Sequence, residues 1–501
     1  MIMKKIFIIA ALSISITAAF TSCKKFLDIN QDPDRLTSEQ ANIAQLLTSV
    51  TANVGFTGGS DLQRYTALIM QQYSGQSTGA QNQTQDYEKY LITGSDVNNL
   101  FSSIFATTLN DIETIISKGG QLNAPHYTGV AKILKAYTYQ IAVDAWGDLP
   151  YSESQKGVSN LSPKYDDDEQ IYKNLITLLN EGITEVSAAT STFSPGTNSL
   201  IYPGTFTTTR NNWIKFANTL KLRIFLHYSK ADRAFLVSQM TALVNSGGPF
   251  MTSNADNFQM NFINESRRQN PIQQFEIDRQ NYLMAGSELV NLMNSRNDPR
   301  RSTYFTQFPA GSGNYLGSTP GASPSILYSR IHTYLRGALT NTPVANANGS
   351  FSATANQYTG AAPIRMLTYA EYNFIRAEAA LYGVPGDAQT FYQEGIRASM
   401  LDAGVASGDI TSYIATNGTL TGGIQDRLKR IIEEKYIASY GVVMEPWTDW
   451  RRTGFPTITK ASNGVIDEIP RSLFYPQNEV DLNPNAPAQK ASMLARVFWD
   501  K

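Results

Sequence analysis

The stretch TYAEYNFIRAEAALYGVPGDAQTFYQEGIRASMLDA, residues 368–403, has the pattern of a complete helix–turn–helix unit. Thr368 and Glu371 have capping-box spacing, in which the hydroxyl and the carboxylate satisfy the first free amides of a helix. Gly383 ends that helix, and Asp387 begins a second one that continues to the end of the stretch. The unit is about 35 residues long, close to the tetratricopeptide period of about 34.

Helical patterns of the same kind occupy most of the remaining chain. In 124–145, apolar residues recur at the period of one helix face. The other expected helical runs are 38–54, 60–75, 95–118, 170–187, two within 211–246, one from Ile424 to near Gly441 and a short one ending at Trp499, with 76–94 a polar loop. Paired helices bury a continuous core only by stacking on their neighbours. The sequence therefore predicts a mainly α protein of tetratricopeptide-like stacked helix pairs, an α-α superhelix.

Residues 247–363 have a different composition. Gly, Pro, Ser, Asn and Thr interrupt the stretch, helical runs are short, and aromatic residues are scattered through it. A structureless segment of this length is abnormal inside a compact domain. We therefore expect an irregular, loop-rich ligand-binding lobe with its own packing. The prediction is one domain, 38–501, with a helical scaffold at 38–246 and 364–501 and the lobe inserted at 247–363.

The first residues have the pattern of an export signal. A basic head precedes an apolar run from Ile6 to Phe20, and Cys23 stands at the cleavage point. The apolar run is about fifteen residues, shorter than the roughly 20 needed to span a bilayer, which disfavours the alternative of a transmembrane helix. We predict a lipoprotein signal peptide at 1–22, lipidation of Cys23 and a tether at 23–37.

Composition restricts the possible partners. Lys and Arg number 41 and Asp and Glu 42, which gives a net charge of −1. Such a chain has no overall field to hold nucleic acid or an anionic bilayer. The charged fraction is only 17%, and the abundant polar residues suit neutral ligands. Cys23 is the one cysteine, so the chain forms no intramolecular disulfide and, once lipidated, has no thiol for catalysis.

Metal-binding patterns are weak. No two of the three histidines, His126, His227 and His332, stand at metal-ligand spacing, and we expect each at the surface or at a helix cap. The carboxylates of 166–169 precede an expected helix, where they favour its positive end. A calcium site is the alternative, but the ligand spacing of a calcium loop is absent. We expect no metal and no cofactor.

Two pairs of carboxylates could serve a glycosidase. Asp144 and Asp148 lie on either side of a Trp-Gly turn, and Glu433 and Glu434 lie on a helix. The first pair is explained more simply by turn and cap formation, and the second by an exposed face pairing with nearby Lys and Arg. We therefore expect a protein that is not an enzyme, with an exported α-helical glycoside hydrolase as the alternative.

Aromatic residues beside guanidinium groups give a stronger pattern. The apolar face of a sugar ring can stack on tyrosine, while neighbouring polar groups read its hydroxyls. The clusters of this kind contain Tyr282 with Arg279, Tyr334 with Arg330, and Tyr87 with Tyr90. Ordinary packing under loops is the alternative for any single tyrosine, so we expect one or two of these clusters to bind ligand.

Several motifs together resemble the SusD/RagB family of outer-membrane nutrient-binding lipoproteins of Bacteroidetes. Besides Cys23 and Phe26-Leu27-Asp28, they are AVDAWGDLPYSES (142–154), YNFIRAEAALYG (372–383), EEKYIASYGVVMEPWTDWRRTG (433–454) and IPRSLFYPQNEVDLNPNA (469–486). Their order and spacing carry the resemblance. Trp146 replaces the usual Tyr of the first motif, and the lobe is unlike that of starch-binding members, so the chain looks closer to a divergent SusD-like branch.

The resemblance implies a fold and a function. The fold would consist of tetratricopeptide helix pairs. The protein would have no enzymatic activity, would be displayed on the outer-membrane surface by a lipid anchor, and would act as a lid over a SusC-like TonB-dependent transporter. The ligand would be a glycan or oligosaccharide, with a peptide as the alternative; a purely structural surface lipoprotein is a third possibility. The Arg376–Glu378 helix and Arg451-Arg452 would stabilise the scaffold without touching ligand.

Overall fold

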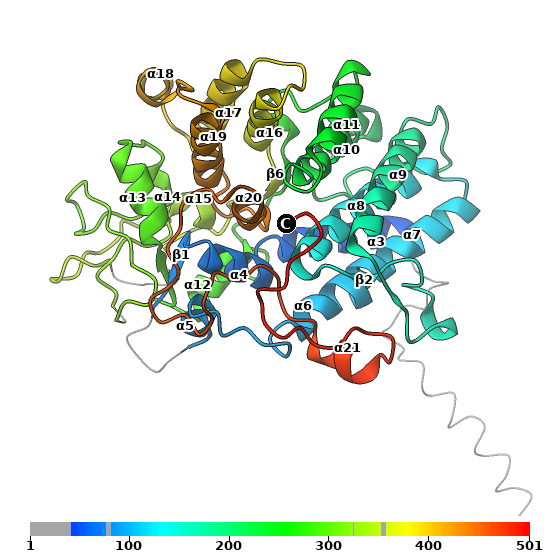
Figure 1. Cartoon of the computed structure of the whole chain (residues 1–501), viewed down its shortest axis with the longest axis horizontal. Helices are drawn as coiled ribbons and strands as arrows, with labels where there is room; N and C mark the ends of the chain where they lie inside the picture. The colour runs from blue at the N-terminus through cyan, green and yellow to red at the C-terminus, as the bar shows by residue number, and fades with distance from the viewer. Residues whose placement is uncertain (1–41, 77–81, 324, 352–356) are drawn as a thin grey trace, which may run out of the picture.

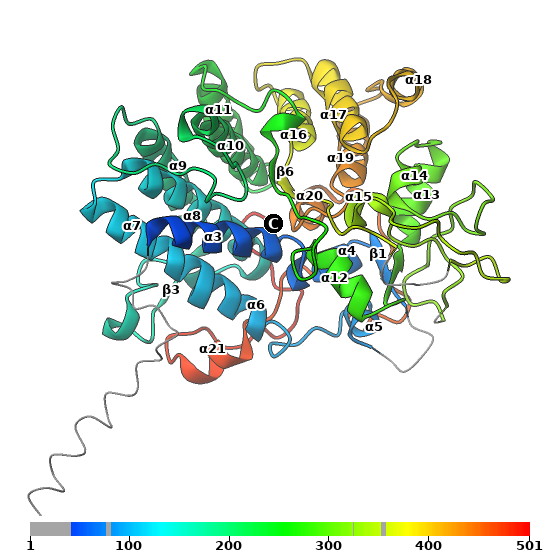
Figure 2. The ribbon, with the colours of Figure 1, turned by 180° about the vertical axis from the view of Figure 1, so that it is seen from behind.

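The protein is mainly helical, and its few strands are short. The computed structural model describes residues 42–76, 82–323, 325–351 and 357–501. Two groups of helices pack side by side, and a loop-rich lobe lies on the side of the molecule opposite the N-terminal group of helices (Figures 1 and 2). This confirms the expected fold of stacked tetratricopeptide-like helix pairs. The predicted signal peptide (1–22), Cys23 and the tether (23–37) lie outside the described residues.

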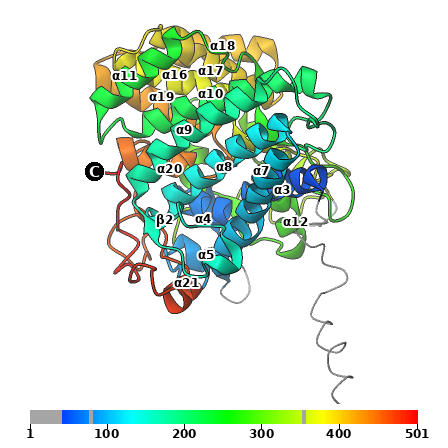
Figure 3. The same cartoon turned by 90° about the vertical axis from the view of Figure 1, so that its right-hand side faces the viewer.

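The first helical group comes from the N-terminal half of the chain. It comprises α3 (Ile43–Thr57), α7 (Asn110–Gln121), α8 (Pro125–Trp146), α9 (Asp168–Val186), α10 (Phe206–His227) and α11 (Arg233–Asn245). Successive members pack on each other, as Figure 3 shows from the side. The single helix expected over 95–118 is instead α6 (Asn98–Ser102), a π-helix at Ser103–Leu109, and then α7.

Helices α8 and α9 approach each other through two glycines. A Cβ atom added to Gly129 would lie 2.7 Å from the carbonyl oxygen of Gly182, and one added to Gly182 would lie 3.0 Å from that of Gly129. The two backbones therefore touch where these residues face each other. The expected apolar stripe of α8 is confirmed, but nearly the whole helix is buried.

The second helical group contains the quoted helix–turn–helix unit. It comprises α16 (Tyr369–Leu381), α17 (Ala388–Asp402), α18 (Ser407–Asn417), α19 (Ile424–Ala438) and α20 (Glu445–Thr453). Thr368 caps α16 as expected, since its hydroxyl accepts from the backbone N–H of Glu371 at 3.1 Å. The second half of the capping box is wrong. The Glu371 carboxylate accepts instead from Arg223 of α10, at 2.7 and 2.8 Å.

The lobe contains short helices and strands. They are β4 (Phe258–Met260), α12 (Pro271–Asp278), β5 (Leu283–Ala285), α13 (Ser287–Ser295), α14 (Arg301–Tyr304) and α15 (Thr333–Arg336). Strand β4 pairs antiparallel with β6 (Ile364–Leu367), at the point where the chain returns to the scaffold. Strand β5 pairs antiparallel with β1 (Tyr73–Gly75). The lobe is therefore joined to the scaffold at both ends and along one strand.

Helices also form outside the runs that the sequence predicts to be helical. The polar segment 76–94 holds α5 (Gln83–Glu88), which follows α4 (Asp61–Ile69), and the C-terminal region holds α20 and α21 (Gln477–Leu482). Strands β2 (Leu149–Pro150) and β3 (Tyr165–Asp166) form a further short pair. The short helix expected before Trp499 is not formed, and that side chain is fully buried. Among the described residues, no helix has both the length and the apolar character to span a membrane.

Candidate functional site

Helix α12 and the turn after it form a corner of the lobe surface. Asn270 caps the helix by accepting from the backbone N–H of Ile272 at 2.8 Å, and Pro271 begins it. Asn281, in the turn, has a φ of +66°. The carbonyl oxygen of Tyr282 then accepts from the backbone N–H of Gln76 at 2.9 Å and from the Thr84 hydroxyl at 2.8 Å. The turn is thus held against the scaffold through its backbone, which leaves its side chains free for other contacts.

Aromatic and guanidinium groups meet at this corner. The rings of Tyr282 and Phe275 lie edge to face with their centroids 6.3 Å apart. The guanidinium groups of Arg64 and Arg279 lie 4.3 and 5.4 Å from the Phe275 ring. Tyr282 is half-buried and Arg279 is exposed. One half-exposed ring beside an exposed guanidinium can stack on a sugar face and donate to its hydroxyls. We call Arg279, Phe275 and Tyr282 the α12 corner.

Tyr334 and Arg330 of the second predicted cluster do not lie at the surface. Tyr334 is only 6% exposed. Its ring lies 4.5 Å from that of Tyr304, the guanidinium of Arg365 lies 3.9 Å above it, and its hydroxyl donates to Asp402 at 3.0 Å. Burial raises the pKa of the Tyr334 hydroxyl well above its usual value. In this structure the ring packs where the lobe meets the scaffold, to which Arg365 and Asp402 belong.

Tyr87 and Tyr90 are also buried. Tyr87 lies on α5 and packs edge to face on Tyr65, with the ring centroids 4.7 Å apart. The hydroxyl of Tyr90 accepts from the backbone N–H of Ala461 at 3.0 Å. Burial raises the pKa of both hydroxyls. The structure therefore brings neither tyrosine to the α12 corner, and in it both are packing residues.

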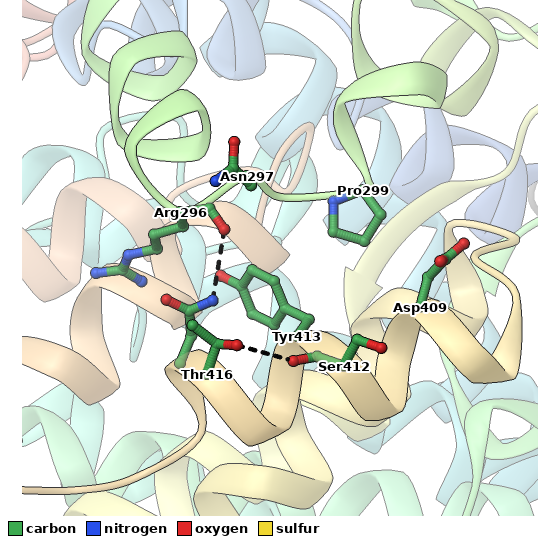
Figure 4. Close-up of a pocket in the computed structure, with 8 residues that line it drawn as sticks. Arg296, Asn297, Pro299, Asp409, Ser412, Tyr413 and Thr416 are labelled. Atoms are coloured by element: carbon green, nitrogen blue, oxygen red, sulfur yellow. Dashed lines mark hydrogen bonds between the residues drawn. The ribbon is translucent and has the colours of Figure 1, made fainter.

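A polar hollow of about 250 Å³ lies between α18 and the turn from α13 to α14 (Figure 4). Its lining residues are Arg296, Asn297, Pro299, Asp409, Ser412, Tyr413, Thr416 and Asn417. Tyr413 is only 4% exposed, and its hydroxyl donates to Glu434 at 2.6 Å. The hollow offers hydroxyls and amides but no open ring face. Sequence reasoning missed it because its two walls are more than a hundred residues apart.

The first carboxylate pair considered for catalysis, Asp144 and Asp148, makes hydrogen bonds within the fold. Asp144 is fully buried and accepts from Tyr172 and, at 3.0 Å, from the Trp499 indole. Asp148 accepts from the backbone N–H of Asp168 at 3.0 Å, which agrees with the expected turn and cap. A carboxyl group that acts on a polysaccharide must touch it, and Asp144 in this conformation does not reach the surface.

The second carboxylate pair is less exposed than expected. Glu434 is fully buried and accepts from Arg300 at 2.9 Å and from Arg296 at 2.5 Å. Glu433 pairs with Arg296 as well. Burial alone would raise the pKa of Glu434, but the charges of Arg296 and Arg300 outweigh it and lower that pKa. The expected nearby partner is confirmed for Glu433, which lies 3.8 Å from Lys429. The arginine partners come from the distant lobe, and the expectation of an exposed face is wrong for Glu434.

His227 lies inside a buried charge network, which corrects the expectation of a surface or cap position. Its ring nitrogens lie 2.9 Å from the Tyr172 hydroxyl and 3.5 Å from a carboxylate oxygen of Glu445. Burial alone would raise the pKa of Glu445, but Arg223 and Lys435 hold it well below the usual range. His126 is also buried, and its ring nitrogens contact Ser194 and Ala188.

Comparison with known proteins agrees with this fold. A sequence profile described as starch-binding and associating with the outer membrane, of the SusD-like family, matches residues 33–476. No curated protein gives a significant match. Among solved structures, a chitin-binding protein superposes with a TM-score of 0.74 at 24% identity, over 92% of this chain and 100% of that one.

Two further solved structures show the same likeness. A SusD homologue from Bacteroides fragilis superposes with a TM-score of 0.73 at 22% identity, over 92% of this chain and 100% of that one. A chitin-binding SusD homologue from Flavobacterium johnsoniae gives 0.70 at 20% identity, over 92% and 98%. At these identities the structures show the fold, and the profile match over most of the chain shows the family. The chain therefore belongs to the SusD-like family of starch-binding, outer-membrane-associated proteins.

Proposed function

We propose that this protein binds a glycan or oligosaccharide at the cell surface without cleaving it and delivers it to a SusC-like TonB-dependent outer-membrane transporter. The family description, starch-binding and outer-membrane-associated, supports the glycan. Two similar structures are chitin-binding proteins, which supports a β-linked amino sugar polymer as the first ligand to test. The polar, nearly uncharged composition of the chain suits a neutral ligand.

The α12 corner is the observation that carries this proposal. It combines a half-exposed tyrosine ring and an exposed guanidinium on the irregular lobe, and its backbone is fixed to β1. A backbone that is already fixed loses less conformational entropy when a ligand binds, which favours binding. Of the predicted site residues, Tyr282 and Arg279 are therefore proposed to contact the ligand in this conformation.

The other predicted site residues are proposed to act from behind this surface. Arg330 donates to Glu276 on the inner face of α12 at 3.1 Å, and so holds the helix that carries the corner. Tyr334 is buried where the same lobe meets the scaffold. Tyr87 and Tyr90 lie next to the strand pair that anchors the turn, on α5 and directly after it.

Binding to defined oligosaccharides tests the proposal. Chitohexaose and maltohexaose serve as probes in isothermal titration calorimetry with the mature chain, followed by chromatography of the sugar after long incubation. We expect saturable binding of one probe and its recovery intact. Shortened products that disappear in an Asp148→Asn variant would favour the hydrolase alternative. Binding of a mixed peptide library with neither sugar bound would favour the peptide alternative.

Delivery is proposed to need a partner, because import requires a pore through the outer membrane. Lipidation of Cys23 would hold the protein at the membrane, and the tether 23–37 would serve as a hinge that lets it cover a transporter as a lid. Extraction in mild detergent followed by pull-down on a C-terminal tag should recover the transporter. Recovery of this protein alone, from cells shown to express the transporter, would contradict the lid role.

A further inference from the structure

A cluster of buried charged residues lies at the inner face of α12, and it contains more positive than negative groups. Glu276 is 1% exposed, Arg330 5% and Arg336 4%. Nη2 of Arg330 donates to Oε2 of Glu276 at 3.1 Å, and Nη1 of Arg336 lies 3.7 Å from the same oxygen. Two buried guanidinium groups therefore share one carboxylate. The cluster therefore carries one positive charge in excess. Buried charges are stable only when they are paired and hydrogen-bonded, so this excess charge needs a counter-ion.

Nearby groups among the described residues do not balance this charge. Burial, and then the charge of Arg336, lower the pKa of His332 to about 4, so its imidazole is neutral at pH 7. Arg336 donates to Gln273 at 2.7 Å, and its guanidinium lies 3.9 Å over the Tyr358 ring; both partners are neutral. Burial lowers the pKa of Arg336, as is expected of a cation without a full counter-charge. In the sequence, residues 352–356 (SATAN) contain no ionisable side chain.

One donor of the cluster lacks a hydrogen-bond partner in the part of the chain that the structure describes. Nε of Arg330 is buried, and no hydrogen-bond acceptor for it exists among the described residues. Both arginines line a cavity with room for about one water-sized sphere, roughly 10 Å³. The other lining residues are Thr306, Pro343, Phe351, Gln357 and Tyr358. The Thr306 hydroxyl accepts from the backbone N–H of Arg330 at 2.9 Å, which leaves its own proton free to donate.

We propose that this cavity binds one monatomic anion, a halide such as chloride, between Arg330 and Arg336. A halide offers one negative charge and many acceptor directions in a single sphere that is somewhat larger than a water molecule, so the side chains that line the cavity would move outward slightly to admit it. It would neutralise the excess charge and accept from groups that lack an acceptor. Oε1 of Glu276 also lacks a partner among the described residues, and a water molecule beside it could donate to it. A water in the cavity in place of the halide would leave the excess positive charge unbalanced.

The halide would also affect the ligand surface, an extension that depends on the proposed function. Helix α12 presents Glu276 and Gln273 to the two arginines, while Phe275 and Arg279 belong to the α12 corner. An occupied cavity would therefore fix the helix that positions the corner. Glycan affinity should then rise with chloride concentration at constant ionic strength.

Anomalous scattering gives the direct test. Crystals of the protein soaked in sodium bromide should show an anomalous peak in the cavity, within about 3.5 Å of guanidinium nitrogens of both arginines. Electron density there without anomalous signal would identify a water and overturn the proposal. This experiment uses no glycan, so its outcome is independent of the proposed function.

Thermal unfolding in chloride and in gluconate at equal ionic strength gives the second test. Because only the folded state binds the anion, Tm should rise by about 1–3 °C for each tenfold increase in chloride above the dissociation constant. Arg330→Gln should abolish this response. Glu276→Gln should strengthen it at least tenfold in apparent affinity, because it removes the competing negative charge. Arg397→Gln, at an exposed ion pair, is the matched control and should respond like the unmodified protein. Equal Tm values in both salts would overturn the proposal.

Discussion

Arg452 of α20 and Glu378 of α16 form a fully buried ion pair in which Nη2 donates to Oε2 at 2.6 Å. Arg452 also donates to Asp449, one turn away, at 2.6 Å. The pair joins two motifs that are 74 residues apart in the chain and that both contributed to the family resemblance. This contact agrees with the scaffold role that the resemblance implies for the two motifs.

Removing one partner of that pair should strongly destabilise the fold. In Glu378→Gln, Arg452 keeps its charge but loses a buried counter-ion, so the free energy of unfolding should fall by about 3–5 kcal/mol. The control is Glu394→Gln, which breaks the exposed pair with Arg397 and should cost less than about 1 kcal/mol. Urea unfolding followed by circular dichroism measures both. Equal effects would show that burial does not set the strength of the pair.

Loss of the Tyr282 ring should weaken ligand binding and leave the fold intact. Tyr282→Ala removes a half-exposed ring, so the binding free energy should fall by about 1–2 kcal/mol, or roughly 5–30-fold in affinity. Tyr282→Phe keeps the ring and should bind nearly as well. Calorimetry with whichever hexasaccharide binds the unmodified protein measures the change, and Tm should stay within about 1 °C. An unchanged affinity in Tyr282→Ala would remove the α12 corner from the proposal.

Tyr334 should behave in the opposite way. Its ring is buried against Tyr304, and its hydroxyl donates to Asp402, so Tyr334→Ala leaves a cavity and removes one of the hydrogen bonds to that carboxylate, which Arg365 still contacts. The free energy of unfolding should fall by about 3–5 kcal/mol. A variant with native stability but weakened glycan binding would instead place this ring in the ligand site. Chemical unfolding and calorimetry on the same sample distinguish the two outcomes.

Asp168 should make stability depend on pH. Burial raises the pKa of its carboxyl group to about 6, from about 4 in the unfolded chain. The folded state therefore binds more protons than the unfolded state between these values, and the contribution of this group to stability falls as pH rises from 4 to 6. Asp168→Asn does not ionise, so it should be about 1–3 kcal/mol more stable than the unmodified protein at pH 7 and little different at pH 4. Lower stability of the variant at pH 7 would show that the carboxylate charge is needed there.

Changing Cys23 should release the protein from the membrane. Cys23→Ala removes the proposed acyl acceptor, and each buried methylene of the lost chains contributes about 0.8 kcal/mol to membrane affinity. Fractionation of cells should then find the variant in the soluble fraction. A variant that stays in the membrane fraction with its signal removed would disprove the lipoprotein interpretation.

Local sequence patterns predicted the helices well and their partners poorly. Thr368 caps its own helix because the bond spans three residues, and such bonds are visible in the sequence. Glu371 was assigned to the same local motif, but it pairs with Arg223, 148 residues away. An ion pair with a buried arginine outweighs a weak cap. Nothing near Glu371 in the chain indicates that arginine, so the error came from long-range packing.

The candidate site was predictable only to the level of residue type. Tyr282 and Tyr334 both have an arginine nearby in sequence and stand in the same irregular lobe, so local composition cannot distinguish them. Their exposure differs because Tyr334 meets Tyr304 and Arg365, which other parts of the chain supply. Tyr87 was expected in a loop, yet the Asn82–Gln85 capping box begins a helix there. That short motif could have been read from the sequence.

The pairing of β4 with β6 has an evolutionary consequence. Phe258 lies opposite Leu367 and Met260 opposite Ile364, so the chain leaves the scaffold and re-enters it at adjacent positions. Loops between these strands can change in length and sequence while the closing hydrogen bonds stay the same, provided that the pairing of β5 with β1 and the buried contact of Arg300 with Glu434 are kept. Selection could therefore vary these loops between relatives that share one helical framework. In such a design, new nutrient preferences would arise without rebuilding the parts that keep the protein folded.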